Sequence, residues 1–365
     1  MERIAVVNRT NFKNFGSVLQ CYALCDTIME LGYMAEIIWE KGSISQNFDF
    51  RPKKLLAIIL KAIRYPSVIK EIFLETKTTG EMITSDKSEK MFDSFVDEHL
   101  TQKKYSSFDL KKIANTDYYK KFVCGSDQIW SSEALYVDPL MYLQFCPSEK
   151  RIAYAPSIGS KRIPRYNASK MKKYINSIPT ISVREKTAQV LISKLCGRKC
   201  QVVLDPTLLI KREKWLSLVS HEMKEQDYFL LYFLDLPDEK TIKTIISYLK
   251  NNNINNVICL GVKVNKLEKE VNVKYPDCGP KEFLYLINNA KRIITDSYHG
   301  ILFSIIFRKE FIALQRKYIR YDQSSRLIDI LRMLKIENRF MVNNRIIELE
   351  DIDYDTVDYI LKLRS

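Results

Sequence analysis

The chain has 365 residues, of which 46% are hydrophobic and 28% charged, the composition of a globular protein long enough for two domains. Its net charge of +14 favours an anionic partner, such as a phosphorylated substrate, an acidic membrane face or a nucleic acid. No zinc-finger or RNP-like motif is present, so we expect no nucleic-acid partner. No stretch reaches the roughly 18 uninterrupted apolar residues of a membrane span.

The first residues and the cysteines predict a cytoplasmic protein with reduced thiols. Met1-Glu2-Arg3 leads directly into a strand-like run at 4–7, so we expect no signal peptide. The eight cysteines are scattered, and several fall within helix or strand patterns. Two pairs have i, i+4 spacing, but no CxxC motif or histidine accompanies them, which favours buried helical thiols over zinc. The three histidines lie far apart, so we expect no metal site.

The first 40 residues predict a βαβ unit, with strands at 4–7 and 35–39 around a helix at 18–31. The loop between the first strand and the helix lacks GxGxxG, so a dinucleotide fingerprint is absent. Asn14, Gly16 and Gln20 either line a ligand crevice or form a capped helix start, and both interpretations stay open.

Residues 41–115 interrupt this alternation and predict a helical insertion in the first domain. Its first helix, at 53–61, carries a Leu-Ile stripe with lysines beside it. Such a helix could rest on an anionic membrane surface. It could also pack on the sheet with its lysines in water, which we favour. Further helices are expected at 68–75 and 88–100.

A predicted strand at 122–124 runs into Gly125, Ser126, Asp127, Gln128 and, after one residue, Trp130. The small residues leave room for a ligand, the polar ones can hold hydroxyl groups, and the indole offers a flat surface suited to a sugar. The alternative is a turn that caps a helix. We favour the functional interpretation.

The next two strands also end in polar or small residues. The strand at 151–155 runs into a loop that contains Ser157, and the strand at 180–183 is followed by Arg184. Arginine offers a planar fork that matches carboxylate and phosphate. The alternative for Arg184 is a salt bridge to Glu185 or another neighbour. A strand at 201–204 completes a first domain at 1–206.

The remaining chain predicts a linker at 207–227, a second Rossmann-like domain at 228–345 and a terminal helix at 346–365. Within this domain, 291–314 reads as strand, polar turn, buried helix and strand. The turn holds Asp296, Ser297, Tyr298, His299 and Gly300. Backbone N–H groups at a helix start suit an anion, and His299 would be the proton carrier. The alternative is a histidine that caps the helix and contacts the preceding aspartate.

Seven stretches occur in the order NFKNFGSVLQCYAL, VCGSDQIW, IAYAPSIG, ISVREKTA, VVLDPTLL, ITDSYHGILFSIIFRKEF and SSRLIDIL. In order and spacing the sequence resembles the polysaccharide pyruvyl transferase family. The resemblance implies an α/β fold of two Rossmann-like doubly wound domains facing a cleft, as in GT-B glycosyltransferases. The sequence departs from the family pattern at two positions. Pro156 stands where the family usually has a small residue, and Ser17 stands where alanine is common.

The resemblance also implies a reaction and its substrates. The pyruvyl group of phosphoenolpyruvate would pass to a hexose of a cell-surface polysaccharide or its lipid-linked precursor, forming a ketal, with no cofactor. The acceptor would place the protein in the cytoplasm, with peripheral contact at the inner membrane face as an open alternative. A nucleotide-sugar glycosyltransferase and a non-catalytic capsule-assembly protein are the other functions considered. The oligomeric state is left open.

The resemblance puts Arg184 and His299 at the centre of this chemistry. We expect Arg184 to clamp the carboxylate or phosphate of the donor. His299 would act as general acid or stabilise the departing phosphate, and Asp127 would orient or deprotonate the sugar hydroxyl. The residues expected to bind substrate are Asn14, Gly16, Gln20, Gly125, Ser126, Gln128, Trp130, Ser157, Asp296, Ser297, Tyr298, Gly300 and Arg326.

Overall fold

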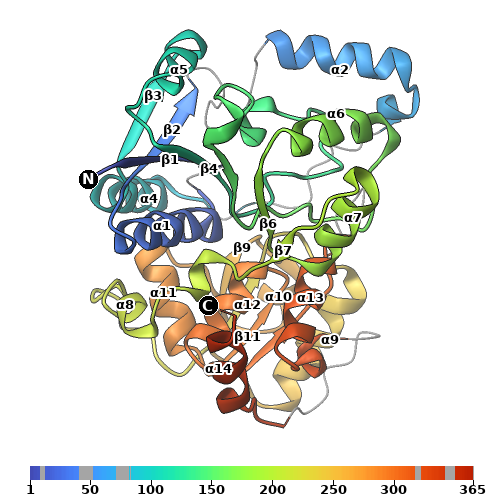
Figure 1. The fold of residues 1–365 in the computed structure, drawn as a ribbon. Coiled ribbons are helices and arrows are strands. Elements are labelled where there is room, and N and C mark those ends of the chain that lie inside the picture. Colours follow the sequence, from blue (N-terminus) through green and yellow to red (C-terminus); the bar gives the residue numbers. More distant parts are fainter. Residues whose placement is uncertain are drawn as a thin grey trace. The chain divides into compact units, whose positions relative to one another are not determined.

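The computed structural model describes residues 1–8, 13–40, 52–70, 82, 84–316, 322–341 and 350–364. The chain divides into two compact units, which are described separately (Figure 1). Unit 1 comprises Met1–Lys77 and Val96–Leu209, and unit 2 comprises Thr78–Phe95 and Ile210–Ser365.

Unit 1 is built on a seven-stranded parallel sheet in the order β3-β2-β1-β4-β5-β6-β7. The strands are β1 Arg3–Val7, β2 Met34–Glu40, β3 Gln102–Tyr105, β4 Lys121–Cys124, β5 Arg151–Ala153, β6 Thr180–Val183 and β7 Gln201–Val202. The order reverses between β1 and β4, where Ile4 pairs with Lys121 and Val7 with Cys124. This is the Rossmann order with its switch point, and central strands buried on both faces explain the apolar run in β1.

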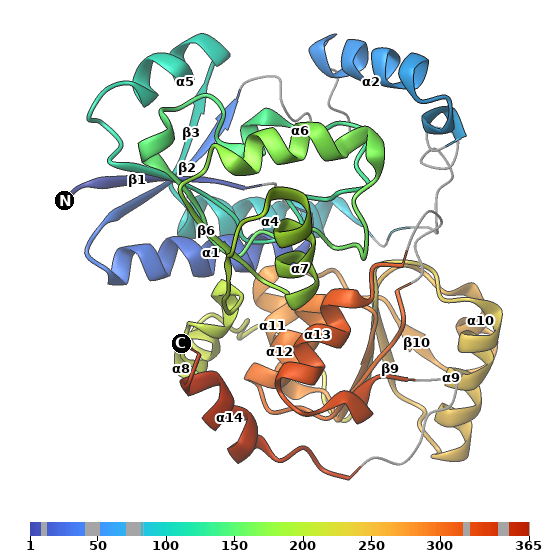
Figure 2. The ribbon, with the colours of Figure 1, turned by 45° about the vertical axis from the view of Figure 1, so that its right-hand side comes forward.

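In the sequence, the helices of unit 1 alternate with these strands. They are α1 Phe15–Glu30, α2 Pro52–Arg64, α5 Ser107–Ala114, α6 Arg165–Asn176 and α7 Lys186–Cys196, with short 3-10 turns at Pro139–Tyr142, Ser148–Lys150 and Pro206–Leu208. In Figure 2, α1 and α6 lie on opposite sides of the strands, as right-handed crossovers in two directions from β1 require.

The predicted insertion at 41–115 is only partly helical. Its last part forms the edge strand β3, which pairs with β2 from Ile37↔Gln102 to Glu40↔Tyr105, and then α5. The strand β3 was not predicted, because its sequence, QKKY, contains no apolar run. An edge strand whose lysines point outward does not need one. Thr78–Phe95, most of it in the helix α4 Asp86–His99, groups with unit 2. The helix expected at 68–75 lies mostly outside the described residues.

Unit 2 repeats the same topology with five parallel strands in the order β10-β9-β8-β11-β12. The strands are β8 Phe229–Phe233, β9 Val257–Gly261, β10 Val273–Lys274, β11 Arg292–Thr295 and β12 Phe311–Ala313. The helices are α8 Arg212–Leu216, α9 Glu239–Asn251, α10 Asn265–Glu268, α11 Pro280–Asn289, α12 Tyr298–Ile306, α13 Ser325–Met333 and α14 Tyr354–Lys362, with a 3-10 turn at Glu337–Arg339. The predicted α/β class with two Rossmann-like domains is therefore confirmed, whereas the shared cleft stays a prediction.

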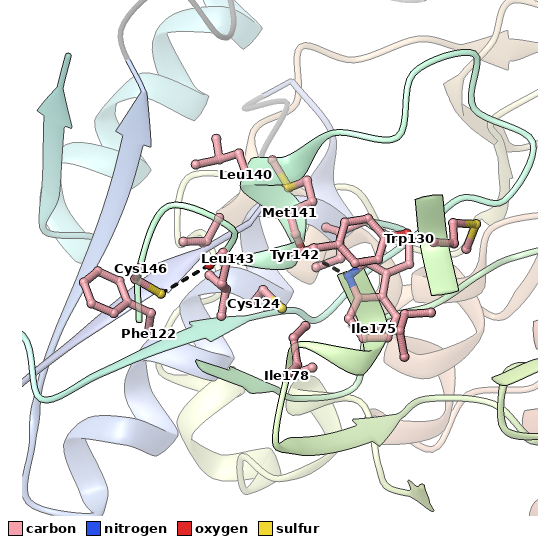
Figure 3. Packing of buried hydrophobic residues seen from close by; sticks show 14 of the residues in the cluster. Phe122, Cys124, Trp130, Leu140, Met141, Tyr142, Leu143, Cys146, Ile175 and Ile178 are labelled. Atoms are coloured by element: carbon pink, nitrogen blue, oxygen red, sulfur yellow. Dashed lines mark hydrogen bonds between the residues drawn. The ribbon is translucent and has the colours of Figure 1, made fainter. Parts of the chain in front are cut away.

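Trp130 belongs to the core of unit 1 and not to a sugar-binding surface, so this part of the prediction is wrong (Figure 3). Its ring is 1% exposed and stacks on Tyr142, with centroids 5.0 Å apart and an angle of 4° between the planes. The indole N–H donates to the carbonyl of Met141 at 2.9 Å, so its polar atom is satisfied inside the protein. An indole that is 1% exposed, with its N–H paired inside the core, offers no surface to a ligand.

All eight cysteines lie in described segments as free thiols, and seven of them are buried. In the part of the chain that the structure describes, no helix combines the length and apolarity needed to cross a bilayer. The same segments contain no group of three or more His, Cys, Asp or Glu side chains placed to hold a metal ion.

Candidate functional site

The loops that follow the strands of unit 1 meet at the carboxyl edge of its sheet. After β4, the hydroxyl of Ser126 donates to the carbonyl of Ala155 and to the carboxylate of Asp205, both at 3.1 Å. After β5, the hydroxyl of Ser157 donates at 2.9 Å to Glu185, which follows β6. Loops from four strands are thus tied together at the place where open parallel sheets bind ligands.

Arg184 is the centre of this edge, with a side chain only 1% exposed. Its Nη1 lies 2.7 Å from the carboxylate of Asp205, its Nη2 3.6 Å from Asp127 and its Nε 4.0 Å from Glu185. We refer to these four residues as the acidic cluster, since it holds two more carboxylates than guanidinium groups. The salt-bridge interpretation of Arg184 is therefore what the structure shows, and its contact with an anionic donor stays a prediction.

Asp127 is the member of the acidic cluster that reaches solvent. Its side chain is 17% exposed, against 3% for Glu185 and 0% for Asp205. The hydroxyl of Ser17 donates to its second oxygen at 2.9 Å, so a helix of the first βαβ unit also holds it. A carboxylate fixed by two neighbours and open to solvent can accept a hydroxyl hydrogen from a ligand.

The backbone before Asp127 explains why glycine is found there. Gly125 has φ +125°, and a Cβ at this position would lie 1.9 Å from the carbonyl oxygen of Tyr154. Asp127 itself has φ 64°, in the left-handed region. Gln128, half-buried, packs where a Cβ on Gly159 would lie, 2.2 Å from its amide nitrogen. These contacts set the direction of the loop, which ordinary strand and helix patterns do not encode.

Asn14, Gly16 and Gln20 have structural contacts at the start of α1. The side chain of Asn14 accepts from the N–H of Ser17 at 3.0 Å and caps the helix. Gly16 is buried in the first turn. Gln20 is fully buried and donates to the carbonyl of Ser17 at 2.9 Å. The capped helix start is what the structure shows here, and a contact with substrate stays a prediction.

In unit 2, the turn after β11 is built on two buried side chains. The carboxylate of Asp296 accepts from the N–H of Leu234 at 2.7 Å and of Asp235 at 3.1 Å, which holds the loop after β8. Burial, opposed by the nearby Arg316, raises the pKa of Asp296 to about 6. The hydroxyl of Ser297 accepts from the N–H of Gly300 and caps α12, so the cap is Ser297 and not His299.

His299 lies in the first turn of α12 and is 6% exposed. Its ring packs edge-on against Tyr298, with centroids 5.4 Å apart. The guanidinium carbon of Arg326, at the start of α13, lies 5.7 Å from the centroid of the Tyr298 ring. Gly300 is required because a Cβ there would lie 2.7 Å from the hydroxyl of Thr295. The fold thus brings together the first turn of α12, which holds His299, and the start of α13, which holds Arg326.

Sequence reasoning missed several members of these two edges. Asp205 binds Arg184, and Asp235 binds Arg316 with Nε and carboxylate oxygen 2.7 Å apart. The hydroxyl of Ser324 accepts from the N–H of Arg316 at 2.9 Å. The signal was available, since Asp205, Asp235 and Arg316 each follow a predicted strand within three residues. We refer to Asp235, Asp296 and Arg316 as the mixed cluster of unit 2.

Three solved structures illustrate what the fold is similar to. UGT89C1 of Arabidopsis thaliana, complexed with UDP-L-rhamnose, has a TM-score of 0.48 at 9% identity over 100% of this chain and 93% of the other. The UDP-GlcNAc 2-epimerase of Methanocaldococcus jannaschii has 0.46 at 14% over 100% and 92%. The heptosyltransferase WaaC of E. coli with ADP has 0.39 at 10% over 86% and 87%. At these scores the likenesses carry no argument about function.

No curated protein matches the chain. A model of the family described as polysaccharide pyruvyl transferase matches residues 14–318, which include the acidic cluster, the first turn of α12 and Arg316. This range is well over half of the 365 residues. The chain therefore belongs to the polysaccharide pyruvyl transferase family.

Proposed function

We propose that the protein transfers the pyruvyl group of phosphoenolpyruvate to two hydroxyls of one hexose, in a cell-surface polysaccharide or its lipid-linked precursor. Family membership over residues 14–318 is the observation that carries the proposal. We further infer that the reaction takes place in the cytoplasm, where a lipid-linked acceptor would bring the enzyme to the inner membrane face.

The first turn of α12 supports a role in donor binding. Phosphoenolpyruvate carries a carboxylate and a phosphate. A helix start offers backbone N–H groups and a favourable dipole to such anions. Here the turn also holds His299, and Arg326 lies against its first residue, Tyr298. The donor's anionic groups would bind at this turn, and the buried arginine would balance part of their charge.

The proposed reaction has three steps. A proton from His299 adds to the methylene carbon of the donor, which becomes the methyl group of the product. A sugar hydroxyl attacks the cationic central carbon and loses its proton. A second hydroxyl of the same sugar then displaces phosphate, which leaves with the bridging oxygen and takes up the proton of that hydroxyl. The products are one ketal and one inorganic phosphate.

Asp127 would accept the proton of an attacking hydroxyl. It is the most exposed carboxylate of the acidic cluster and is fixed by Ser17 and Arg184. Arg184 contacts it at 3.6 Å, and in the proposal it holds the carboxylate in place. Replacing Asp127 by asparagine would keep the hydrogen bond from Ser17 and remove the base.

The test is to incubate the purified protein with phosphoenolpyruvate and lipid-linked or free oligosaccharides. We expect phosphate release that depends on the acceptor, together with a product heavier by one pyruvyl ketal. Thermal-shift measurements with UDP and GDP form the second arm. Stabilisation by a nucleotide without phosphate release would indicate a nucleotide-sugar glycosyltransferase, and a response to neither ligand would indicate a non-catalytic role in capsule assembly.

A further inference from the structure

The helix α2 Pro52–Arg64 presents its apolar side chains to solvent (blue in Figure 2). Five large aliphatic residues on one side of the helix are between 47% and 74% exposed. They are Leu55, Leu56, Ile59, Leu60 and Ile63. Their spacing of i, i+1, i+4, i+5 and i+8 places them on a single stripe. We refer to them as the α2 stripe.

The opposite face of α2 is attached to unit 1 through a lysine. The ammonium group of Lys61 donates to the side-chain oxygen of Asn167 at 2.7 Å and to the carbonyl of Leu135. It also lies 5.3 Å from the ring centroid of Tyr166, and the ring of Tyr65 packs 6.4 Å from the same ring. Burial, with Lys170 nearby, lowers the pKa of Lys61 to about 8.

This orientation is the reverse of the one favoured from the sequence. We expected the Leu-Ile stripe to pack on the sheet and the lysines to lie in water, and for the stripe and for Lys61 this is wrong. A buried ammonium group costs free energy unless its hydrogen bonds are made, and here they are made by Asn167 and Leu135. Because Lys61 is held inward by these specific contacts, the stripe is directed away from unit 1.

The charges around the stripe select its partner. Residues 52–70 contain Lys53, Lys54, Lys61, Arg64 and Lys70, and no aspartate or glutamate. Two copies of α2 packed together would bring these cations close to one another, which opposes self-association. An anionic bilayer surface offers acyl chains to the stripe and phosphate groups to exposed cations such as Arg64 and Lys70. At 13 residues, or about 20 Å, the helix lies in the interface and is too short to span it.

We propose that α2 binds the surface of an anionic phospholipid bilayer, with its axis parallel to the membrane plane and the α2 stripe inserted among the lipids. The inference stands on the exposure, the charge and the attachment of one helix, and it does not depend on the proposed chemistry. It supplies a physical reason for an enzyme of this kind to meet a lipid-linked acceptor.

The experiment is flotation of the full chain with vesicles of phosphatidylcholine, alone or mixed with phosphatidylglycerol. The stripe variant Leu56→Gln/Ile59→Gln/Ile63→Gln removes apolar surface without changing charge. The matched control is Phe108→Gln/Val190→Gln/Leu363→Gln, three side chains that are also at least 40% exposed. We expect the anionic vesicles to bind the wild type and the control equally. The stripe variant should bind about a thousandfold more weakly, since burial of each of the three side chains contributes about a tenfold factor.

A second readout follows insertion directly. The three tryptophans of the wild type are all buried, at 7% exposure or less, so they report little from the surface. In Ile63→Trp, tryptophan emission should shift to the blue on anionic vesicles, and added salt should weaken binding. Three results would overturn the proposal. They are no flotation of the wild type, equal flotation of the stripe variant, and a dimer in sedimentation that the stripe variant dissociates while vesicles bind neither protein.

Binding of α2 to vesicles can be tested independently of the proposed reaction. With a water-soluble acceptor, the stripe variant should release phosphate from phosphoenolpyruvate at the wild-type rate, because α2 takes no part in the chemistry. If phosphate release is absent in both proteins but flotation differs as expected, the reaction is wrong and the membrane surface stands.

Discussion

The acidic cluster of unit 1 and the mixed cluster of unit 2 both lie at the carboxyl edges of two sheets of the same topology. The acidic cluster follows β4, β6 and β7, whereas the mixed cluster follows β8, β11 and β12, beside the switch point between β8 and β11. In unit 1 one guanidinium group meets three carboxylates. In unit 2 one guanidinium group, that of Arg316, meets two carboxylates, and the first turn of α12 with His299 follows Asp296 directly. The fold thus sets where a site forms, and the residues just after each strand set its charge.

Because of this difference, the proposal assigns the sugar hydroxyls to unit 1 and the anionic donor to unit 2. A cluster with excess carboxylate suits hydroxyl groups, because it can accept their hydrogens, whereas it repels a phosphate. A helix start with a buried arginine against its first residue, as at the first turn of α12, suits an anion. The following four experiments test this division, in order of expected effect.

The largest effect is expected from His299→Ala. If His299 supplies the proton, kcat for phosphate release should fall at least ~100-fold, since general acid catalysis contributes typically that much. The matched control is His221→Ala, which removes an exposed histidine between α8 and β8. Normal turnover by His299→Ala at the wild-type melting temperature would show that the assignment is wrong. His299→Gln, which keeps a polar side chain, provides a second variant should the alanine not fold.

Arg184→Met tests the acidic cluster through stability. Removing the buried cation leaves carboxylates without compensation, so the free energy of unfolding in urea should fall by about 3–5 kcal/mol. In the double variant Arg184→Met/Asp205→Asn one of the carboxylates is neutral, and part of the loss should be recovered. A single variant as stable as the wild type would contradict the structural role of Arg184 and favour a role in binding alone.

The mixed cluster should show a pH dependence of stability through Asp296. Burial raises its pKa to about 6 from the ordinary 3.8, so the folded state binds the proton more tightly than the unfolded chain. This contribution is fully present below about pH 4 and is lost as the pH rises through about 6, a decrease of roughly 2–3 kcal/mol. Urea unfolding of Asp296→Asn should lack this decrease. The same pH profile in both proteins would remove Asp296 as its source.

The smallest effects are expected from the two helix caps, Asn14 in unit 1 and Ser297 in unit 2. Asn14→Ala and Ser297→Ala should each lower the free energy of unfolding by about 1 kcal/mol. The control cap is Asp238, whose side chain accepts from Thr241 N–H at the start of α9. If the two variants lose activity beyond that of Asp238→Ala at equal stability, Asn14 and Ser297 also contact substrate. Equal activity in all three would leave them as caps only.

The periodicity of the chain was enough to predict both sheets, because strands buried on two faces are continuous apolar runs and helices between them repeat with a different period. It failed at β3, whose QKKY sequence has no apolar run, and at the two-residue strand β10. It also failed at Trp130, whose place in the core depends on the ring of Tyr142. Candidate residues were found where a polar residue follows a strand. The partners Asp205 and Arg316 were missed, although the same rule would have included them.

The sequence by itself determined the class of the fold, the order of its elements and which residues stand at strand ends, since these follow from local apolar patterns. Only the tertiary structure decided which of these residues pair. Arg184 and Asp205 are 21 positions apart, and Asp235 and Arg316 are 81 apart. It also decided that the apolar stripe of α2 faces solvent. That orientation depends on contacts of Lys61 with residues 74 and 106 positions away, which no local pattern can encode.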